Sequence, residues 1–305
     1  MQSKKINIGG QAVIEGVLIR GPEKYVVAVR KNKKILTMNG KIKKKNYNFL
    51  KWPLIRGFIN LVEMTVIGIK SLMWSTEQAT GDEEKIGKNA IALMLLLSVA
   101  VVIVFFVALP YFLANFIGFA EEKKPILFNL VDGAIRIIIF LAYIFAISFM
   151  KDVKILFQYH GAEHKAIHCY ENGKKLNTIN VKKFTTLHPR CGTSFILIVF
   201  IVSVIVFSLL PSFIVFYYPH FLKLSYWLRK GILIPARILL LPVIAGISYE
   251  ILKLSDKRQN NILFKLISMP GLALQKITTQ EPNEKQIEVA IYSIKRLLEI
   301  EKAGK

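Results

Sequence analysis

Cysteine is scarce in this sequence, which speaks against a fold held together by disulfides. Only two cysteines, Cys169 and Cys191, occur among 305 residues. Both lie in a segment that the charge distribution assigns to the cytoplasm, where thiols stay reduced. Metal ligation or simple burial of these side chains is therefore favoured over a disulfide between them.

Two further absences concern the start of the chain. Met1–Asn7 is polar and basic with no apolar stretch behind it, so we expect no cleaved signal peptide. The glycine-punctuated segment 8–22 is not followed by Gly-Lys-Ser or Gly-Lys-Thr. That absence favours a small β-subdomain with tight turns over a phosphate-binding loop.

Acidic residues are few, with 20 aspartates and glutamates against 42 lysines and arginines, for a formal net charge of +22. Segment 1–89 has 17 basic and 7 acidic residues, 151–193 has 8 and 3, and 253–305 has 10 and 6. These three segments carry +19 of the +22, and the positive-inside rule places them, with both termini, on the cytoplasmic side of a bacterial cell membrane.

This topology accounts for the basic charge without a specific nucleic-acid partner. The expected partners are the lipid bilayer and its anionic head groups, with a protein partner or the ribosome as an alternative.

Long apolar runs are what the sequence has in abundance, and hydrophobic residues make up 53% of it. Each run exceeds the roughly 18–20 apolar residues that a helix needs to cross a bilayer. The four runs cover residues 90–118, 126–150, 194–218 and 231–252. We therefore predict a mainly α, polytopic membrane protein with about four transmembrane helices and a small cytoplasmic α+β part.

The predicted organisation follows from these runs. The chain divides into a cytoplasmic β-rich segment (1–52), an amphipathic interfacial helix and linker (53–89), transmembrane helices 1–2 (90–150), a cytoplasmic His/Cys metal-site loop (151–193), transmembrane helices 3–4 (194–252) and a cytoplasmic helical segment (253–305).

Three of these segments carry local signals. Tyr25–Arg30 and Ile35–Met38 are short β-type runs around a Lys-Asn-Lys-Lys turn, which predicts a hairpin. Pro53–Trp74 is interrupted by charged residues at helical spacing, which favours an interfacial helix over a fifth span. Asn283 and Gln286 form a capping-box pattern at the start of a final helix.

Histidine is also rare, with five in the chain, yet three of them cluster between residues 160 and 168 on a predicted helix, Lys151–Glu171. His160-x-x-Glu163-His164 has the His-x-x-Glu-His pattern of one metalloprotease class. There, two histidines bind zinc and the glutamate acts as general base. A second group, His188-Pro-Arg-Cys191, is near enough in sequence to fold back onto the first.

These residues predict a zinc site, because imidazole and thiolate suit Zn²⁺ before Mg²⁺ or Ca²⁺. The proposed metal ligands are His160, His164, His188 and Cys191, with His168 and Cys169 as reserves. Glu163 is the candidate catalytic residue. If all four ligands bind, the site is closed and structural; if three bind, a fourth position stays open for catalysis. Histidines that are only hydrogen-bonded and bind nothing are the third alternative.

Charges inside the predicted spans favour a structural role. Asp132 and Arg136 lie one turn apart in the second span, and Arg237 falls at a similar depth in the fourth. Such residues usually pair. We expect an ion pair that locks helices, and a solute carrier ranks last among the possible functions.

Several blocks of the sequence resemble the YqhQ-like family of bacterial multi-pass membrane proteins, a family of unknown function described as predicted metal-dependent enzymes. The blocks are Gly9–Gly16, Arg20–Pro22, Tyr159–Lys165, His188–Phe195, Thr278–Pro282 and Ile287–Ile291. The resemblance implies a membrane location and a metal, and it supplies no substrate.

Two functions are left open by the sequence. The first is a metal-dependent hydrolase of unknown substrate at the cytoplasmic membrane face, with Glu15 and Glu281 as further candidates for supporting its site. The second is a non-enzymatic assembly or interaction protein with a structural zinc site.

Overall fold

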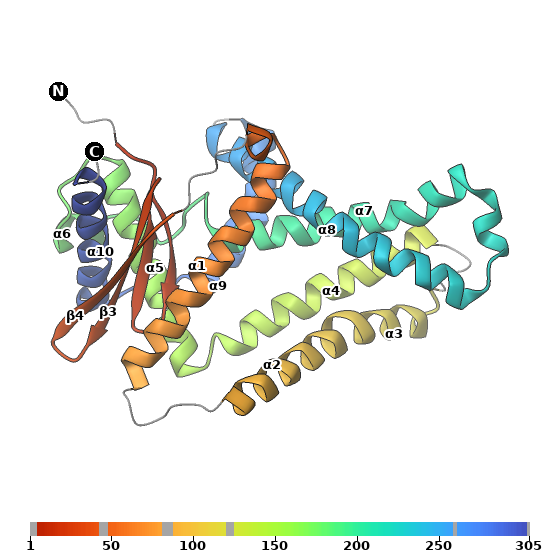
Figure 1. Cartoon of the computed structure of the whole chain (residues 1–305), viewed down its shortest axis with the longest axis horizontal. Helices are drawn as coiled ribbons and strands as arrows, with labels where there is room; N and C mark the ends of the chain where they lie inside the picture. The colour runs from red at the N-terminus through yellow and green to blue at the C-terminus, as the bar shows by residue number, and fades with distance from the viewer. Residues whose placement is uncertain (1–4, 43–47, 81–87, 120–124, 259–260, 304–305) are drawn as a thin grey trace.

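The computed structural model describes residues 5–42, 48–80, 88–119, 125–258 and 261–303. A β-sheet covered by helices forms one end of the molecule, and a bundle of long apolar helices extends away from it (Figure 1). The histidine-bearing helix lies in the sheet-containing part, which we call the globular unit: strands β1–β4 with helices α5, α6 and α10.

The sheet is a four-stranded antiparallel meander in the order β1-β2-β3-β4. Its strands are Gly9–Val13, Gly16–Arg20, Lys24–Lys31 and Lys34–Lys41. The predicted hairpin is confirmed as β3–β4, and the glycine-rich segment forms β1–β2 as a β-subdomain with tight turns. Glu15 and Asn32 occupy these turns with φ of +52° and +57°. Such turns need left-handed backbone, which Asn tolerates well and Glu rarely adopts.

Both faces of the sheet are covered, because alternate residues of a strand point to opposite sides. One face, which includes Val17 and Ile19 of β2, packs with α5 (Lys151–Glu171) and α10 (Glu284–Lys302). On the opposite face, Leu18 packs in a cluster with Ile67 of α1 (Ile55–Thr80). The sheet is therefore the centre of three layers.

Helix α10 docks by the apolar stripe that its sequence contains. Its stripe is buried along its length: Ile287, Ala290, Ile291, Ile294 and Leu297. The predicted capping box is present, since the Asn283 side chain accepts from Gln286 N and the Gln286 side chain accepts from Asn283 N. At the other end, the Glu301 carboxylate accepts from the backbone N–H groups of Glu23 and Lys24, in the β2–β3 turn.

Within the described residues, five helices rather than the predicted four are long and apolar enough to cross a membrane. The additional one is α1, which has the lowest mean hydropathy of the set, 1.2 against 2.0 to 2.9 for the others. The other four are the continuous run of α2 (Lys88–Ile103), η2 (Val104–Ala108) and α3 (Leu109–Phe116), then α4 (Pro125–Ile147), α7 (Gly192–Tyr217) and α8 (Tyr226–Lys257).

Helix α1 is held against α8 by a polar contact and by close backbone packing. The Arg56 guanidinium donates to both carboxylate oxygens of Glu250, at 2.7 and 2.5 Å. A Cβ added at Gly246 of α8 would lie 2.5 Å from the carbonyl oxygen of Leu54, so only glycine fits there. In Figure 1, α1 lies at the end of the bundle next to the sheet and is steeper than α2, α3 and α4.

The expected ion pair forms within one helix, so it does not lock two helices, and the contact between helices is a hydrogen bond to an amide. Arg136 donates to Asp132 at 2.7 Å within α4. Arg237 of α8 donates to Asn129 Oδ1 at 2.9 Å, and this contact joins α8 to α4. The remaining short elements are η1 (Asn48–Lys51), α6 (Thr178–Lys182), η3 (Pro219–Lys223) and α9 (Ile262–Thr278).

Candidate metal centre

Helix α5 places three histidines on one face, because residues four apart lie one turn above another. The ring centroids of His160 and His164 are 4.4 Å apart. A fourth ring, His188, lies 5.5 Å from His164 and 4.5 Å from His168. The fold therefore brings all four histidines of the predicted cluster into a continuous group.

The loop that carries His188 and Cys191 is fixed from both sides. Gln275 of α9 accepts from His188 N at 2.7 Å and donates to His188 O at 2.9 Å, and both residues are buried. Cys191 is the N-cap of α7, where its Sγ accepts from Thr193 N at 3.4 Å. The loop is thus held by the Gln275 side chain of α9 and by the first turn of α7.

The possible donor atoms form two neighbouring groups. His160, His164 and Cys191 have donor atoms that all lie within 4.8 Å of one another, and the same is true of His168, Glu171 and His188. Three of the four predicted ligands thus come together in one group. The fourth, His188, stands with the second group, next to His164 of the first.

Backbone carbonyls fix the ring protons of the first group. His160 Nδ1 lies 2.9 Å from Thr278 O, and His164 Nδ1 lies 2.5 Å from Thr186 O. A carbonyl can only accept, so Nδ1 carries the proton in both rings and Nε2 keeps its lone pair. In His160 that Nε2 lies 3.2 Å from Cys191 Sγ. Metal-binding histidines usually have this kind of support for the other ring nitrogen.

Burial keeps these groups uncharged. It lowers the pKa of His164 well below its ordinary value and lowers the pKa of His188 to about 4. It also raises the pKa of the Cys191 thiol, although hydrogen bonds from Thr193 act in the opposite direction. Neutral imidazoles are the form that binds metal, whereas the thiol has to lose its proton on binding.

Glu163 is the buried carboxylate beside these donors. Its side chain lies against β1, where a Cβ added at Gly10 would be 2.8 Å from Glu163 Oε1. Its Oε2 is buried with no hydrogen-bond partner among the described residues. Burial raises the pKa of Glu163 to about 8; the nearby His160 lowers it and Cys191 raises it by smaller amounts. Glycine at position 10 is needed because a Cβ there would also lie 2.5 Å from the carbonyl oxygen of Leu18.

A cavity of about 500 Å³ lies against these residues. The candidate ligands His160, His164 and Cys191 line it together with Glu163. The opposite walls come from the glycine-rich β1 and β2 strands and from two helices of the bundle, through Met64 of α1 and Tyr249 of α8. The candidate centre therefore opens into a space between the globular unit and the bundle.

Comparison with known proteins places this fold in a family. The family described as "Protein of unknown function (DUF1385)" matches residues 52–300. The chain belongs to this family. It is also 35% identical over 310 residues to "Uncharacterized protein YqhQ" of Bacillus subtilis (strain 168), which covers 96% of this chain and 92% of that protein. The family resemblance read from the sequence is confirmed. No solved structure matches the chain.

The DUF1385 match includes every histidine and cysteine of the two donor groups, but not the whole cavity wall. Gly10 and Arg20 belong to the strands that precede residue 52. The match to the Bacillus subtilis relative covers nearly the whole chain. The family's unknown function leaves the chemistry of the cavity to be argued from its residues.

Three acidic or thiol residues that the sequence suggested as further candidates lie elsewhere in this DUF1385 fold. Cys169 is buried in the core, with its Sγ 3.7 Å from Lys175 O. Glu15 accepts from the Tyr159 hydroxyl at 3.2 Å, and Glu281 forms an ion pair with Lys165 at 2.5 Å. These three residues do not line the cavity.

Other residues of the cavity escaped the sequence analysis. Arg20 lines it and is ion-paired with Glu63 of α1. Arg190 also lines it and is ion-paired with Glu171. Glu171 follows His168 by three residues, a helical spacing that could have singled it out. No sequence signal foretells Met64 or Tyr249, which reach the cavity only through packing of α1 and α8.

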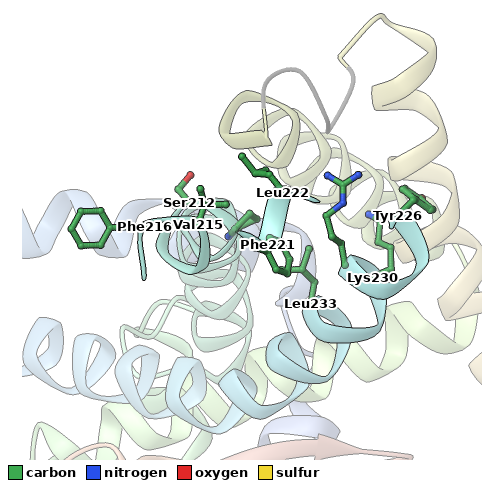
Figure 2. A pocket seen from close by; sticks show the side chains of 10 residues that line it. Ser212, Val215, Phe216, Phe221, Leu222, Tyr226, Lys230 and Leu233 are labelled. Atoms are coloured by element: carbon green, nitrogen blue, oxygen red, sulfur yellow. The ribbon is translucent and has the colours of Figure 1, made fainter. Parts of the chain in front are cut away.

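A second cavity of about 500 Å³ lies at the far end of the bundle, where α7, η3 and α8 meet (Figure 2). Its lining is mostly apolar, with Arg229 and Lys230 on the α8 side. Its described lining residues include no histidine, cysteine or carboxylate. It thus lacks the metal donors and the acid or base that the first cavity combines.

Proposed function

We propose that this protein is a metal-dependent hydrolase of the bacterial cell membrane, with a zinc ion held at the cytoplasmic face by His160, His164 and Cys191. One observation carries the proposal. Three donor atoms within 4.8 Å of one another stand beside a buried carboxylate with an unpartnered oxygen, in the wall of a cavity of about 500 Å³.

The donor set fits zinc. Two imidazoles and one thiolate are ligands that Zn²⁺ accepts, and three protein ligands leave one position for water or substrate. When bound, Zn²⁺ supplies Lewis acidity to a carbonyl or phosphoryl oxygen and lowers the pKa of water. The hydrogen bonds of His160 and His164 to carbonyl oxygens support this fit, because they present Nε2 of each ring as the ligand.

Glu163 has the position of a general base. It lines the same cavity as His160 and His164, and it follows His160 by three residues on one helix. Its Oε2 is not engaged by another described group. A bound Zn²⁺ beside it would counteract the burial that raises its pKa and favour the ionised carboxylate, the form that takes a proton from water. Gly10 backs the other oxygen and restricts where the carboxylate can move.

The topology supports four crossings, with α1 along the membrane surface. Helix α5 packs on β1 and β2, so the sheet and the α4–α7 connection lie on the same side of the membrane. An even number of crossings must then separate β4 from α5. The α2–α3 run and α4 supply two, and α1 as a third would break this parity. The excess of basic residues in the globular unit supports the cytoplasmic side.

Cobalt replacement in the purified full-length protein tests the metal proposal. We expect one Co²⁺ at this site, lost in His160→Gln and in Cys191→Ser and kept in Glu163→Gln. Its visible spectrum should change when acetohydroxamate, a chelating oxygen ligand, takes the open position. A four-ligand spectrum that acetohydroxamate leaves unchanged would support the structural-zinc alternative instead. Protein that takes up no ion would exclude both.

A further inference from the structure

The second donor group lies one helical turn beyond the first. It consists of His168 and Glu171 of α5 and of His188 from the loop before α7. We propose that it is a second site for a divalent transition-metal ion. Together with the proposed first site it would form a binuclear centre, and this last step rests on the proposed function.

The His168 ring of this group is already oriented as a metal ligand requires, whereas the His188 ring needs a shift of its proton. His168 Nε2 lies 2.8 Å from Leu187 O and carries the proton, so Nδ1 is left with its lone pair. His188 Nδ1 accepts from Arg190 N at 3.2 Å, so Nε2 of the neutral ring carries the proton and donates to Glu171 Oε2, 3.4 Å away. For Nε2 to bind an ion, the contact with Arg190 N has to open and the proton has to move to Nδ1. Two ligands at about 2.0–2.1 Å from a tetrahedral ion are separated by about 3.3–3.4 Å. The spacing of this pair is therefore that of two ligands of one ion.

The scaffold holds the group in place. The His188 side chain is only 7% exposed, and its backbone is clamped by the buried Gln275 amide. The His168 ring is stacked on Phe184, with centroids 6.3 Å apart and planes 11° from parallel. Glu171 is 29% exposed, and its carboxylate is the part of the group with most freedom to adjust.

Arg190 is the residue that competes with a cation here. Its guanidinium is ion-paired with Glu171 and also lies 3.5 Å from Asp256. Asp256 gives the guanidinium a second carboxylate to hold when an ion takes Glu171. Arg190 should therefore weaken binding at the second site, and its removal should strengthen it.

The second group reaches the cavity of the first through His188, whereas His168 and Glu171 do not line it. His164 of the first and His188 of the second have ring centroids 5.5 Å apart, and both line the cavity of about 500 Å³. Adjacent divalent ions of this kind act together on one substrate in many phosphatases and aminopeptidases. The second group thus lies where an ion would share the substrate space of the first.

Zinc stoichiometry of the full-length protein tests the second site. The protein is equilibrated with buffered free Zn²⁺ and measured by elemental analysis after gel filtration. We expect two ions per chain in wild type and one in His168→Gln/Glu171→Gln. We also expect one in His160→Gln/Cys191→Ser. Glu299→Gln, which removes an exposed carboxylate elsewhere, is the matched control and should keep both ions.

The outcomes separate the two proposals. A single ion that is lost in His160→Gln/Cys191→Ser but kept in His168→Gln/Glu171→Gln overturns the second site alone. A single ion with the opposite pattern overturns the first site and leaves the second. A cobalt titration of Arg190→Gln is an independent check, since it keeps all six donors. We expect Arg190→Gln to bind Co²⁺ at the second site at least tenfold more tightly than wild type does. An unchanged affinity would contradict the proposal that Arg190 competes with the ion.

Discussion

Glu163 is the residue on which a catalytic reading of the cavity depends. Glu163→Gln keeps the shape of the side chain and removes its basicity. We expect it to retain zinc and to lower turnover by about 10²–10⁴-fold, the usual contribution of a general base. The measurement uses p-nitrophenyl esters and p-nitrophenyl phosphates with zinc-loaded protein. Glu288→Gln, at an exposed carboxylate on α10, is the control. Equal turnover by Glu163→Gln and wild type would remove Glu163 from the chemistry.

Gly161 is a second residue whose substitution should have a measurable effect, here on stability. A Cβ at this position would lie 2.0 Å from the carbonyl oxygen of Gln280, in the segment that follows α9. Gly161→Ala should therefore push α5 away from that segment and cost about 1–3 kcal/mol, as overpacking does. Thermal unfolding in detergent measures it.

Gly231→Ala is the matched control, because a Cβ at Gly231 in α8 meets nothing within 4 Å. Alanine there should leave the unfolding midpoint unchanged or raise it, since it favours helix. A Gly161→Ala midpoint equal to that of wild type would show that α5 and Gln280 can separate freely.

Single residues were partly predictable from the sequence. The rarity and helical spacing of His160 and His164 suffice to pair them on one face, and Cys191 follows from its motif. The division into two groups does not follow, because it depends on how the loop before α7 is clamped by Gln275, far along the chain. Glu163 was found by its place in the motif, whereas the packing of its carboxylate on Gly10 is a contact between distant segments.

At the level of elements, the contact between α1 and α8 includes a partly buried ion pair. Arg56 and Glu250 have side-chain exposures of 31% and 19%, between those of surface and buried pairs. Arg56→Met should lower stability by about 1–3 kcal/mol, because it leaves the Glu250 carboxylate partly buried and unpaired. Arg56→Met/Glu250→Gln should recover part of this loss.

The control for this pair is Arg296→Met on α10. Its ion pair with Glu299 is exposed by 44% and 64%, so its loss should change stability by less than about 0.5 kcal/mol. Thermal midpoints in detergent compare the variants. Equal losses in Arg56→Met and Arg296→Met would mean that the α1–α8 contact contributes no more than a surface pair.

Elements with strong local signals were predictable. Helix α5 spans the predicted residues, the β3–β4 hairpin forms, and the capping box starts α10. Whether α1 crosses the membrane is harder to predict, since its composition lies near the limit for a membrane span. Its contacts add what its composition lacks: α1 meets both the sheet and α8, and neither contact can be read from the segment itself.

For the whole molecule, the proposed topology makes a labelling prediction. The wild-type cysteines are both buried, so they give a low background. His220→Cys, in exposed η3, should react with a membrane-impermeant maleimide in intact cells. Glu77→Cys near the end of α1 and Lys174→Cys after α5 should react only after the cells are permeabilised. Labelling of Glu77→Cys in intact cells would make α1 a crossing helix and contradict the parity argument.

The three-layered packing of the sheet has a consequence for biosynthesis. The ribosome makes β1–β4 first, yet the helices that cover the sheet follow later, α5 after two and α10 after four of the proposed crossings. At about 5–20 residues per second, the interval between Lys41 and Glu284 lasts roughly 10–50 s. Until α10 is made, the face of the sheet that packs with α5 and α10 lacks part of its cover. In the proposed topology, α5 and the loop before α7 are made only after two crossings, so assembly of the proposed metal centre would follow insertion of the first two spans.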